Sequence, residues 1–102
     1  MSVRTNISDD QKHLSIIVES RFDFSLHQHF RDAYIKISNK GTLFTVDLSA
    51  TDYMDSSALG MILLLKDHAE HISGKVVIRN PSESINKILE IAQFHRLMTI
   101  EH

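Results

Sequence analysis

Residues 42–48 form a near-continuous apolar run, and this run limits the fold more than any other feature of the chain. A run of this kind is typical of a strand that is covered on both faces or lies at the centre of a sheet. A helical pattern extends over residues 55–72 and is closed by Gly74. Because the segment 49–54 between them is short and polar, we expect a loop there.

On the N-terminal side, apolar residues alternate with others, which predicts a strand over 13–18 followed by a short partner at 22–24. Ser25 and Gln28 have the spacing of a capping box, in which each side chain bonds to the other residue's backbone N–H. A helix is therefore expected to begin at Ser25, and Gly41 is available to end it in a left-handed conformation. Its predicted buried stripe comprises Leu26, Phe30, Ala33 and Ile37.

On the C-terminal side, residues 75–79 predict one more strand. The pair Asn80-Pro81 breaks the chain, and Ser82 can cap a third helix. Residues 94–100 are expected to pack as a last short element. The apolar positions of the third helix are Ile85, Ile88, Leu89 and Ala92.

The order of these elements describes a β-α-β-α-β layout with right-handed parallel crossovers. At 102 residues the chain has material for one hydrophobic core, so residues 1–102 are expected to form a single domain with its core roughly in 13–100. The helices are too few to cover both faces of a sheet. We therefore predict an α/β fold with a mixed sheet of four or five strands and helices packed mainly on one face.

Composition argues against several classes of function. The chain has no Cys, which removes disulfides, Cys-ligated metals and thiol nucleophiles. Its formal net charge is −2 with no basic stripe, so nucleic acid is not an expected partner. There is no signal-peptide pattern, and the longest apolar run, 61–65, is far below the roughly 18 residues that a membrane span needs. We expect a cytoplasmic protein without membrane insertion.

The segment Asp55-Ser56-Ser57 opens the long helix and carries the most informative polar groups. Asp55 or Ser56 can cap this helix, and the N–H groups of its first turn are receptive to negative charge. On a helical wheel, Ser56 lies roughly 160° from the centre of the core-facing stripe and should point outward. That stripe is predicted to comprise Ala58, Ile62, Leu65, Ala69 and Ile72.

The outward face of the same helix has an unusual composition. It carries Ser56, Gly60, Leu63 and Asp67, and Leu64 borders it. A helix exposed to water usually carries charge there, so two leucines beside an exposed hydroxyl are typical of a docking surface. We call these five residues the docking face. Two simpler interpretations stay open: the motif is only a well-capped helix start, or the last helix covers both leucines.

Residues 47–49, Asp-Leu-Ser, and residues 54–60, Met-Asp-Ser-Ser-Ala-Leu-Gly, resemble the signature of the STAS domain family, as found in anti-sigma factor antagonists. In that family an Asp-Ser-Ser-like element opens the second helix. Further segments fall where the family has matching elements, so the resemblance covers roughly 13–100. These segments are 22–25, 76–81 and 88–92.

Two positions depart from the family pattern. Ala58 stands where Gly is usual, and Ser20-Arg21 stands where the early hairpin often has Gly. Alanine suits a helix interior better than glycine by about 1 kcal/mol, so the first departure stiffens the segment without removing Ser56.

The resemblance implies a binding protein, not an enzyme, that needs no cofactor. In the family, the unphosphorylated form binds an anti-sigma factor or a related regulator with a serine kinase domain. That kinase phosphorylates the residue matching Ser56 and releases the complex, and a serine phosphatase resets it. Free N–H groups at the helix end could hold the phosphate, so we expect a changed surface more than a changed fold. The partner-binding residues are expected to be Asp55, Ser56, Ser57, Gly60, Leu63, Leu64 and Asp67.

Other interpretations have less support. A STAS subunit of a transporter or lipid-trafficking complex would use the same face as a permanent interface, with Ser56 unmodified. Asp47 at the end of a central strand, together with Asp9-Asp10, suggests the acidic pocket of a receiver domain. That pocket needs acids after the first strand, whereas Asp9-Asp10 are expected to precede it, and no Lys closes the final strand. No Gly-x-Ser-x-Gly elbow supports a hydrolase. His68 and His71 are spaced to share a metal, but the sequence places no third ligand, so no metal site is expected.

Overall fold

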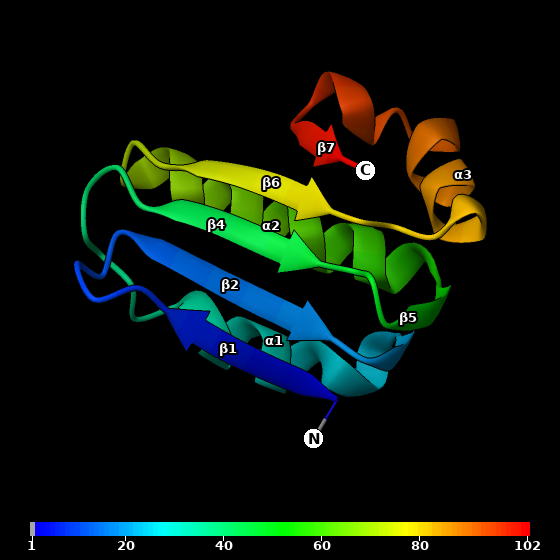
Figure 1. Ribbon diagram of the computed structural model, residues 1–102, viewed down its shortest axis with the longest axis horizontal. Helices are drawn as coiled ribbons and strands as arrows, with labels where there is room; N and C mark the ends of the chain where they lie inside the picture. Colours follow the sequence, from blue (N-terminus) through cyan, green and yellow to red (C-terminus); the bar gives the residue numbers. More distant parts are fainter. Residues whose placement is uncertain (1) are drawn as a thin grey trace.

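The computed structural model describes residues 2–102, whose centre is a sheet of five strands (Figure 1). The strands are β1 (Val3–Ile7), β2 (His13–Val18), β4 (Leu43–Asp47), β6 (Lys75–Arg79) and β7 (Thr99–Glu101). They lie in the order β1-β2-β4-β6-β7; β1 is antiparallel to β2, and the other neighbouring pairs are parallel. The predicted α/β fold with a mixed sheet is confirmed.

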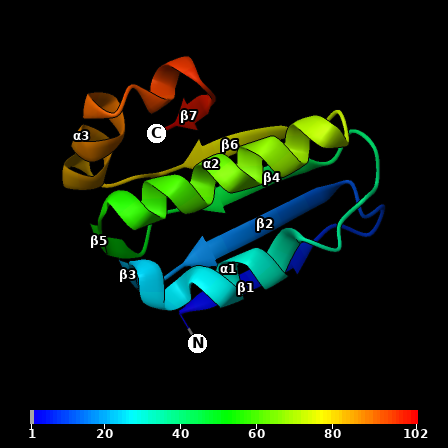
Figure 2. The same ribbon diagram turned by 180° about the vertical axis from the view of Figure 1, so that it is seen from behind.

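Two helices, α1 (His27–Tyr34) and α2 (Ser56–His71), lie side by side on one face of the sheet (Figure 2). The third, α3 (Glu83–Ile91), lies at one end of the sheet (Figure 1). Short 3₁₀ helices precede α1 and follow α3, namely η1 (Phe24–Leu26) and η2 (Phe94–Arg96). The helices therefore pack mainly on one face, as predicted.

β4 is the central strand, with β2 and β6 on either side. Its apolar character is explained by burial, because Phe44 and Val46 have no exposed surface. The helix α2 covers this region, and the predicted core-facing stripe of that helix is confirmed. Ala58, Ile62, Leu65 and Ala69 are buried, Ile72 is partly buried against the same core, and Met61 is a buried addition.

A second, two-stranded sheet lies partly where the sequence predicted a loop. β3 (Ser20–Phe22) and β5 (Thr51–Met54) pair in parallel. The predictions of a loop over 49–54 and of a strand at 22–24 that pairs with the first strand are therefore wrong. Ser20 has a φ of 65°, so the chain turns away from β2 through a left-handed residue at a position where the family often has Gly. The Thr51 hydroxyl then donates to the carbonyl oxygen of Val18 at 2.8 Å and holds β5 beside this turn.

Asp23, not Ser25, caps the first helical segment. Its Oδ1 accepts hydrogen bonds from the backbone N–H of Ser25 at 3.0 Å and from the Ser25 hydroxyl at 2.5 Å. Gln28 instead donates from Nε2 to Oδ1 of Asp32 at 2.8 Å. The predicted capping box is therefore wrong, because Asp is as good a cap as Ser and comes first in the chain. In the predicted stripe Leu26 and Phe30 are buried, Ala33 and Ile37 are partly buried, and Tyr34 is a buried addition.

Gly41 does not end the first helix. It has the expected left-handed φ of 83°, but α1 already ends at Tyr34. The N–H of Gly41 donates to the carbonyl oxygen of Ile72 at 2.7 Å, so this glycine belongs to the turn that leads into β4.

The strand β1 lies outside the predicted core of 13–100. It pairs with β2 from Val3 opposite Val18 to Ile7 opposite Leu14. Only Val3 packs against the core, so β1 has no alternating apolar pattern that would have predicted it. Its position at the sheet edge is supported by an ion pair, because Nε of Arg4 lies 2.9 Å from Oε1 of Glu19.

We predict that Gly74→Ala destabilises the domain. An added Cβ would collide with the carbonyl oxygen of Thr42, which also accepts a hydrogen bond from the N–H of Lys75 at 3.1 Å. We expect a loss of about 2 kcal/mol, which lowers the melting temperature by roughly 8 °C or more in a domain of this size. Thermal unfolding followed by circular dichroism measures the change.

Gly60→Ala is the matched control. A Cβ at Gly60 would meet no atom within 4 Å, so alanine should stabilise α2 by about 0.5–1 kcal/mol. Equal melting temperatures for the two variants would contradict the close approach at Gly74.

Candidate functional site

The carboxylate of Asp55 fixes the start of α2. Its Oδ1 accepts hydrogen bonds from the backbone N–H of Ser57 at 3.1 Å and of Ala58 at 3.3 Å. The same oxygen accepts the Ser57 hydroxyl at 2.5 Å. Of the two predicted caps, Asp55 is therefore the one that acts, and Ser56 becomes the first residue of the helix.

The two serines after Asp55 differ in their freedom. Ser57 is half-buried and its hydroxyl is bound to Asp55, whereas Ser56 is exposed. Within residues 2–102 the Ser56 hydroxyl has no hydrogen-bond partner. We expected free N–H groups at this helix end to hold a phosphate. The amides of Ser57 and Ala58 are not free, because both already donate to Asp55.

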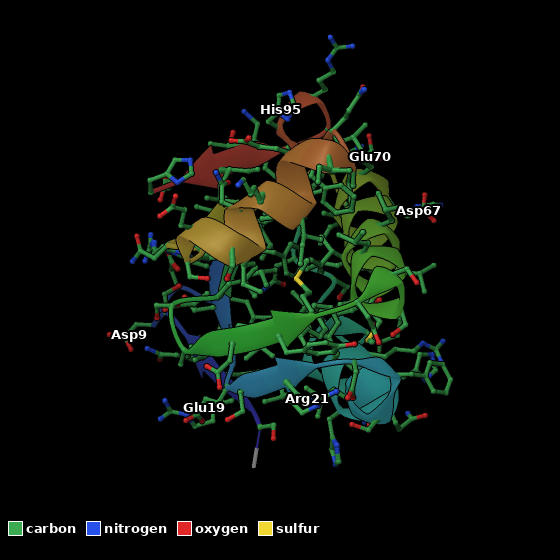
Figure 3. All side chains as sticks on the ribbon, turned by 90° about the vertical axis from the view of Figure 1, so that its right-hand side faces the viewer. Asp9, Glu19, Arg21, Asp67, Glu70 and His95 are labelled. Atoms are coloured by element: carbon green, nitrogen blue, oxygen red, sulfur yellow. The ribbon has the colours of Figure 1, made fainter. Side chains whose placement is uncertain are left out.

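The remaining docking-face residues are also exposed. Leu63 and Leu64 have 41% and 55% of their surface accessible, and Gly60 and Asp67 are exposed as well. Figure 3 shows the Asp67 side chain directed away from the body of the molecule. The last helix does not cover the leucines, because α3 packs against β5. That alternative interpretation is wrong.

A second Asp-capped helix start lies beside the first. β3 and β5 are paired, and their last residues, Phe22 and Met54, lie opposite each other. Asp23 and Asp55 are therefore the first residues after two adjacent strand ends. Figure 3 looks onto this end of the sheet and shows the two strands side by side, with α1 and α2 leaving from them. The pKa of Asp23 is lowered, first by the hydrogen bond from the Ser25 side chain and then by the Ser25 backbone N–H.

Three exposed residues near this end were missed by the sequence analysis. Phe24 is 67% exposed, and Tyr53 is 40% exposed. The guanidinium carbon of Arg21 lies 4.0 Å from the centre of the Tyr53 ring, a cation–π contact. For Phe24 the signal is a repeat, because Asp23-Phe24-Ser25 and Asp55-Ser56-Ser57 are both Asp-x-Ser segments that follow a strand. The contact of Arg21 with Tyr53 has no local signal, because it depends on the pairing of β3 with β5.

Comparison with known proteins identifies the family. The family model for the STAS domain matches residues 4–102. The chain belongs to the STAS domain family. A STAS-domain containing protein of Pseudomonas aeruginosa (strain UCBPP-PA14) is 42% identical over 100 residues, which cover 98% of this chain and 99% of that protein. The resemblance stated from the Asp-Ser-Ser segment is therefore confirmed.

Solved structures support the fold of this STAS domain. The anti-sigma factor antagonist SpoIIAA in its unphosphorylated form matches with a TM-score of 0.71 at 15% identity, covering 96% of this chain and 86% of that one. The Bacillus cell fate determinant SpoIIAA in its phosphorylated form matches with a TM-score of 0.68 at 15% identity, covering 96% of this chain and 89% of that one. At such identities the likeness shows the fold alone.

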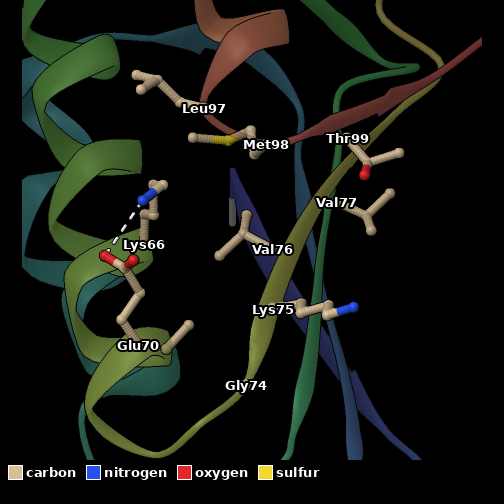
Figure 4. A pocket seen from close by; sticks show the side chains of 10 residues that line it. Lys66, Glu70, Gly74, Lys75, Val76, Val77, Leu97, Met98 and Thr99 are labelled. Atoms are coloured by element: carbon tan, nitrogen blue, oxygen red, sulfur yellow. Dashed lines mark ion pairs between the residues drawn. The ribbon is translucent and has the colours of Figure 1, made fainter.

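Two surface pockets of the STAS domain differ in their relation to the docking face. A pocket of about 330 Å³ lies between α1 and α2 and is lined in part by Ile35, Leu64 and Asp67, so it adjoins that face. Another, of about 310 Å³, lies between the second half of α2, β6 and the segment before β7 (Figure 4). There Nζ of Lys66 pairs with Oε1 of Glu70 at 3.1 Å. Ser56 lines neither pocket.

The histidines of α2 have protein partners of their own. Nε2 of His68 lies 2.7 Å from the carbonyl oxygen of Ile37, and Nδ1 of His71 lies 2.9 Å from that of Asp67. Across residues 2–102, no three His, Cys, Asp or Glu side chains gather as ligands for a metal ion. In the same part of the chain, no helix combines the length and apolar composition needed to cross a membrane.

The acidic residues that suggested a receiver domain lie at opposite ends of the sheet. Asp9 and Asp10 follow β1, so the expectation that they precede the first strand is wrong. They lie in the turn before His13, which pairs with Leu43 at the start of β4, whereas Asp47 ends β4. A strand rises about 3.3 Å per residue, so the two sets are separated by more than 10 Å and form no common acidic pocket.

We predict that Leu64→Glu changes the melting temperature little. Leu64 is 55% exposed, and substitution at a solvated position usually stays within about 0.5 kcal/mol. Ile62→Glu is the matched control on the same helix. Ile62 has no exposed surface, so a glutamate there costs several kcal/mol against a total stability of about 5–15 kcal/mol and should unfold the domain. Similar unfolding of both variants in thermal denaturation would show that Leu64 belongs to the core and that the docking face is assigned to the wrong side of α2.

Proposed function

We propose that this STAS domain is a regulatory binding protein that is switched by phosphorylation of Ser56. The unphosphorylated form binds an anti-sigma factor, or a related regulator with a serine kinase domain, through the docking face together with Asp55 and Ser57. Phosphorylation by that kinase blocks binding. A serine phosphatase removes the phosphate and restores the binding form.

The observation that carries this proposal is the contrast between the two serines at the start of α2. The Ser56 hydroxyl is exposed and free to react, whereas the Ser57 hydroxyl already donates to Asp55. Ser56 also stands on the same helix face as two exposed leucines. A modification there therefore reaches a partner directly, without any movement of the core.

The chemistry of phosphate supports a block by charge. Phosphorylation adds about −1.5 to −2 charges at pH 7. The nearest fixed charge along the chain is the Asp55 carboxylate, of the same sign, and its Oδ1 already accepts the first amides of α2. A partner that covers Ser56 would have to remove this phosphate from water beside a carboxylate of the same sign, and burying such a charge unpaired costs several kcal/mol.

The solved relatives are consistent with such a switch. SpoIIAA is an anti-sigma factor antagonist that exists in a phosphorylated and an unphosphorylated form. This chain has the same fold and keeps a serine in the Asp-Ser-Ser segment. We assign the partner class on this basis, and a permanent interface in a transporter or lipid-trafficking complex is the alternative that the binding experiment below tests.

We predict that the kinase phosphorylates Ser56 and not Ser57. The purified protein is incubated with the kinase and ATP, and the modified residue is located by mass spectrometry of peptides. Ser57→Ala should remain a substrate because the Ser57 hydroxyl is not the acceptor, and Ser56→Ala should not be modified. A phosphate found on Ser57 of the wild-type protein would reject the assignment.

We also predict that Ser56→Asp weakens binding of the purified regulator by roughly tenfold or more, which corresponds to about 1.4 kcal/mol. Ser56→Ala should bind like the wild type, since it adds no charge. Ser38→Asp is the control, because Ser38 is exposed in the segment between α1 and β4. Calorimetry that gives equal affinity for Ser56→Asp and Ser56→Ala would exclude a charge-operated switch and favour the permanent interface.

A further inference from the structure

We propose that Phe24 is a second anchor of the docking face, and that the regulator bound there receives its ring in an apolar pocket next to Ser56. This inference rests on the proposed function, because the partner is the same regulator. It extends the contact surface from α2 onto η1, which the Asp-Ser-Ser motif does not include.

Strand pairing places Phe24 at the position that corresponds to Ser56. β3 and β5 are parallel with Phe22 opposite Met54, and each strand is followed by a capping aspartate and then by one outward residue. On β5 that residue is Ser56, and on β3 it is Phe24. Because neighbouring strands lie about 4.8 Å apart, the two residues leave the sheet from adjacent points.

The local hydrogen bonds make this correspondence closer. Asp23 accepts from the N–H and the hydroxyl of Ser25 at 3.0 and 2.5 Å, and Asp55 accepts from the N–H and the hydroxyl of Ser57 at 3.1 and 2.5 Å. The two turns therefore hold the residue between Asp and Ser in equivalent places. One turn presents a hydroxyl to solvent, and the other presents a phenyl ring.

The exposure of this ring has no explanation in the folded core. Phe24 is 67% exposed, and its one aromatic neighbour within residues 2–102 is His27, with ring centres 5.1 Å apart. The other phenylalanines of the chain are all buried. Aromatic side chains, phenylalanine among them, are enriched at the buried centre of protein interfaces, where a few residues that fill pockets on the partner carry most of the binding energy.

The surroundings of Phe24 indicate the chemistry of the partner surface. Arg21 lies over the Tyr53 ring, its side chain is 64% exposed, and its Nε is 3.4 Å from Oδ2 of Asp23. Within residues 2–102 the terminal nitrogens of Arg21 have no hydrogen-bond partner, so they can bind a carboxylate of the partner. We therefore expect the regulator to present an apolar pocket for Phe24 with an acidic side chain at its rim.

The test measures binding of the purified regulator, obtained with Ser56→Ala protein as bait, to a set of variants by calorimetry. Phe24→Gln removes the ring and keeps a side chain of similar length, and Phe24→Leu keeps an apolar group. Ile91→Gln is the control, since Ile91 is 81% exposed and lies at the end of α3. Ser56→Asp is included to report on the switch itself, and thermal unfolding of each variant verifies its fold.

We expect Phe24→Gln to weaken binding tenfold or more, Phe24→Leu to weaken it less, and Ile91→Gln to stay within twofold of the wild type. If Phe24→Gln and Phe24→Leu bind like the wild type while Ser56→Asp binds weakly, Phe24 is no anchor and the proposed function stands. If Ser56→Asp also binds like the wild type, the switch itself is wrong and the inference fails with it. If Phe24→Gln lowers the melting temperature, the affinity of Phe24→Leu decides the test, because leucine conserves the apolar surface.

Discussion

The Asp55 carboxylate is the interaction on which the arrangement of this surface depends. One oxygen accepts from two backbone amides and one hydroxyl, and these three bonds set where α2 begins. The direction of every later side chain on the helix follows from that starting point, because successive residues are rotated by about 100°. Ala58 and Ile62 are thereby turned into the core, and the residues at 56, 60, 63 and 67 are turned outward. The same bonds select which serine keeps a free hydroxyl.

The small sheet of β3 and β5 positions this helix start beside another of the same kind. Phe22 and Met54 are both buried, so the pair is held by the core, and the residues just beyond them emerge at the surface. The left-handed Ser20 is needed for this pairing, because the chain must leave β2 before it can lie along β5. Two helix starts on adjacent parallel strands then form one continuous surface, although they are 32 residues apart in the sequence.

The elements that could be predicted from the sequence are those whose own residues are periodic and mostly buried. β4 lies in a near-continuous apolar run, and α2 repeats its buried positions at helical spacing, so both have local signals. β1 and β5 have none: four of the five residues of β1 are exposed, and β5 is buried only at its two ends. They are strands because partners pair with them, which is tertiary information.

The residues of the candidate site also divide into those with a local sequence signal and those without one. The wheel placed Ser56, Leu63 and Leu64 on the outer face because helix geometry is regular, and the structure agrees. Phe24 could not be placed in this way, because its position beside Ser56 comes from β3 lying next to β5. Asp23 and Ser25 are equally acceptable caps and stand two residues apart, so hydrogen-bond chemistry alone does not choose between them.

Phosphate on Ser56 would act very differently on the free domain and on a complex. In the free domain the group is solvated, and two unit charges 4 Å apart repel by only about 1 kcal/mol in water. The cap at Asp55 is made of several bonds that do not involve the Ser56 hydroxyl, so this repulsion leaves the fold intact. Under a partner the effective dielectric constant falls to about 20, and the same pair repels by about 4 kcal/mol before the lost hydration of the phosphate is counted. The fold would tolerate a charge that the proposed interface would not, and this difference would allow a small domain to be switched at one hydroxyl as proposed above.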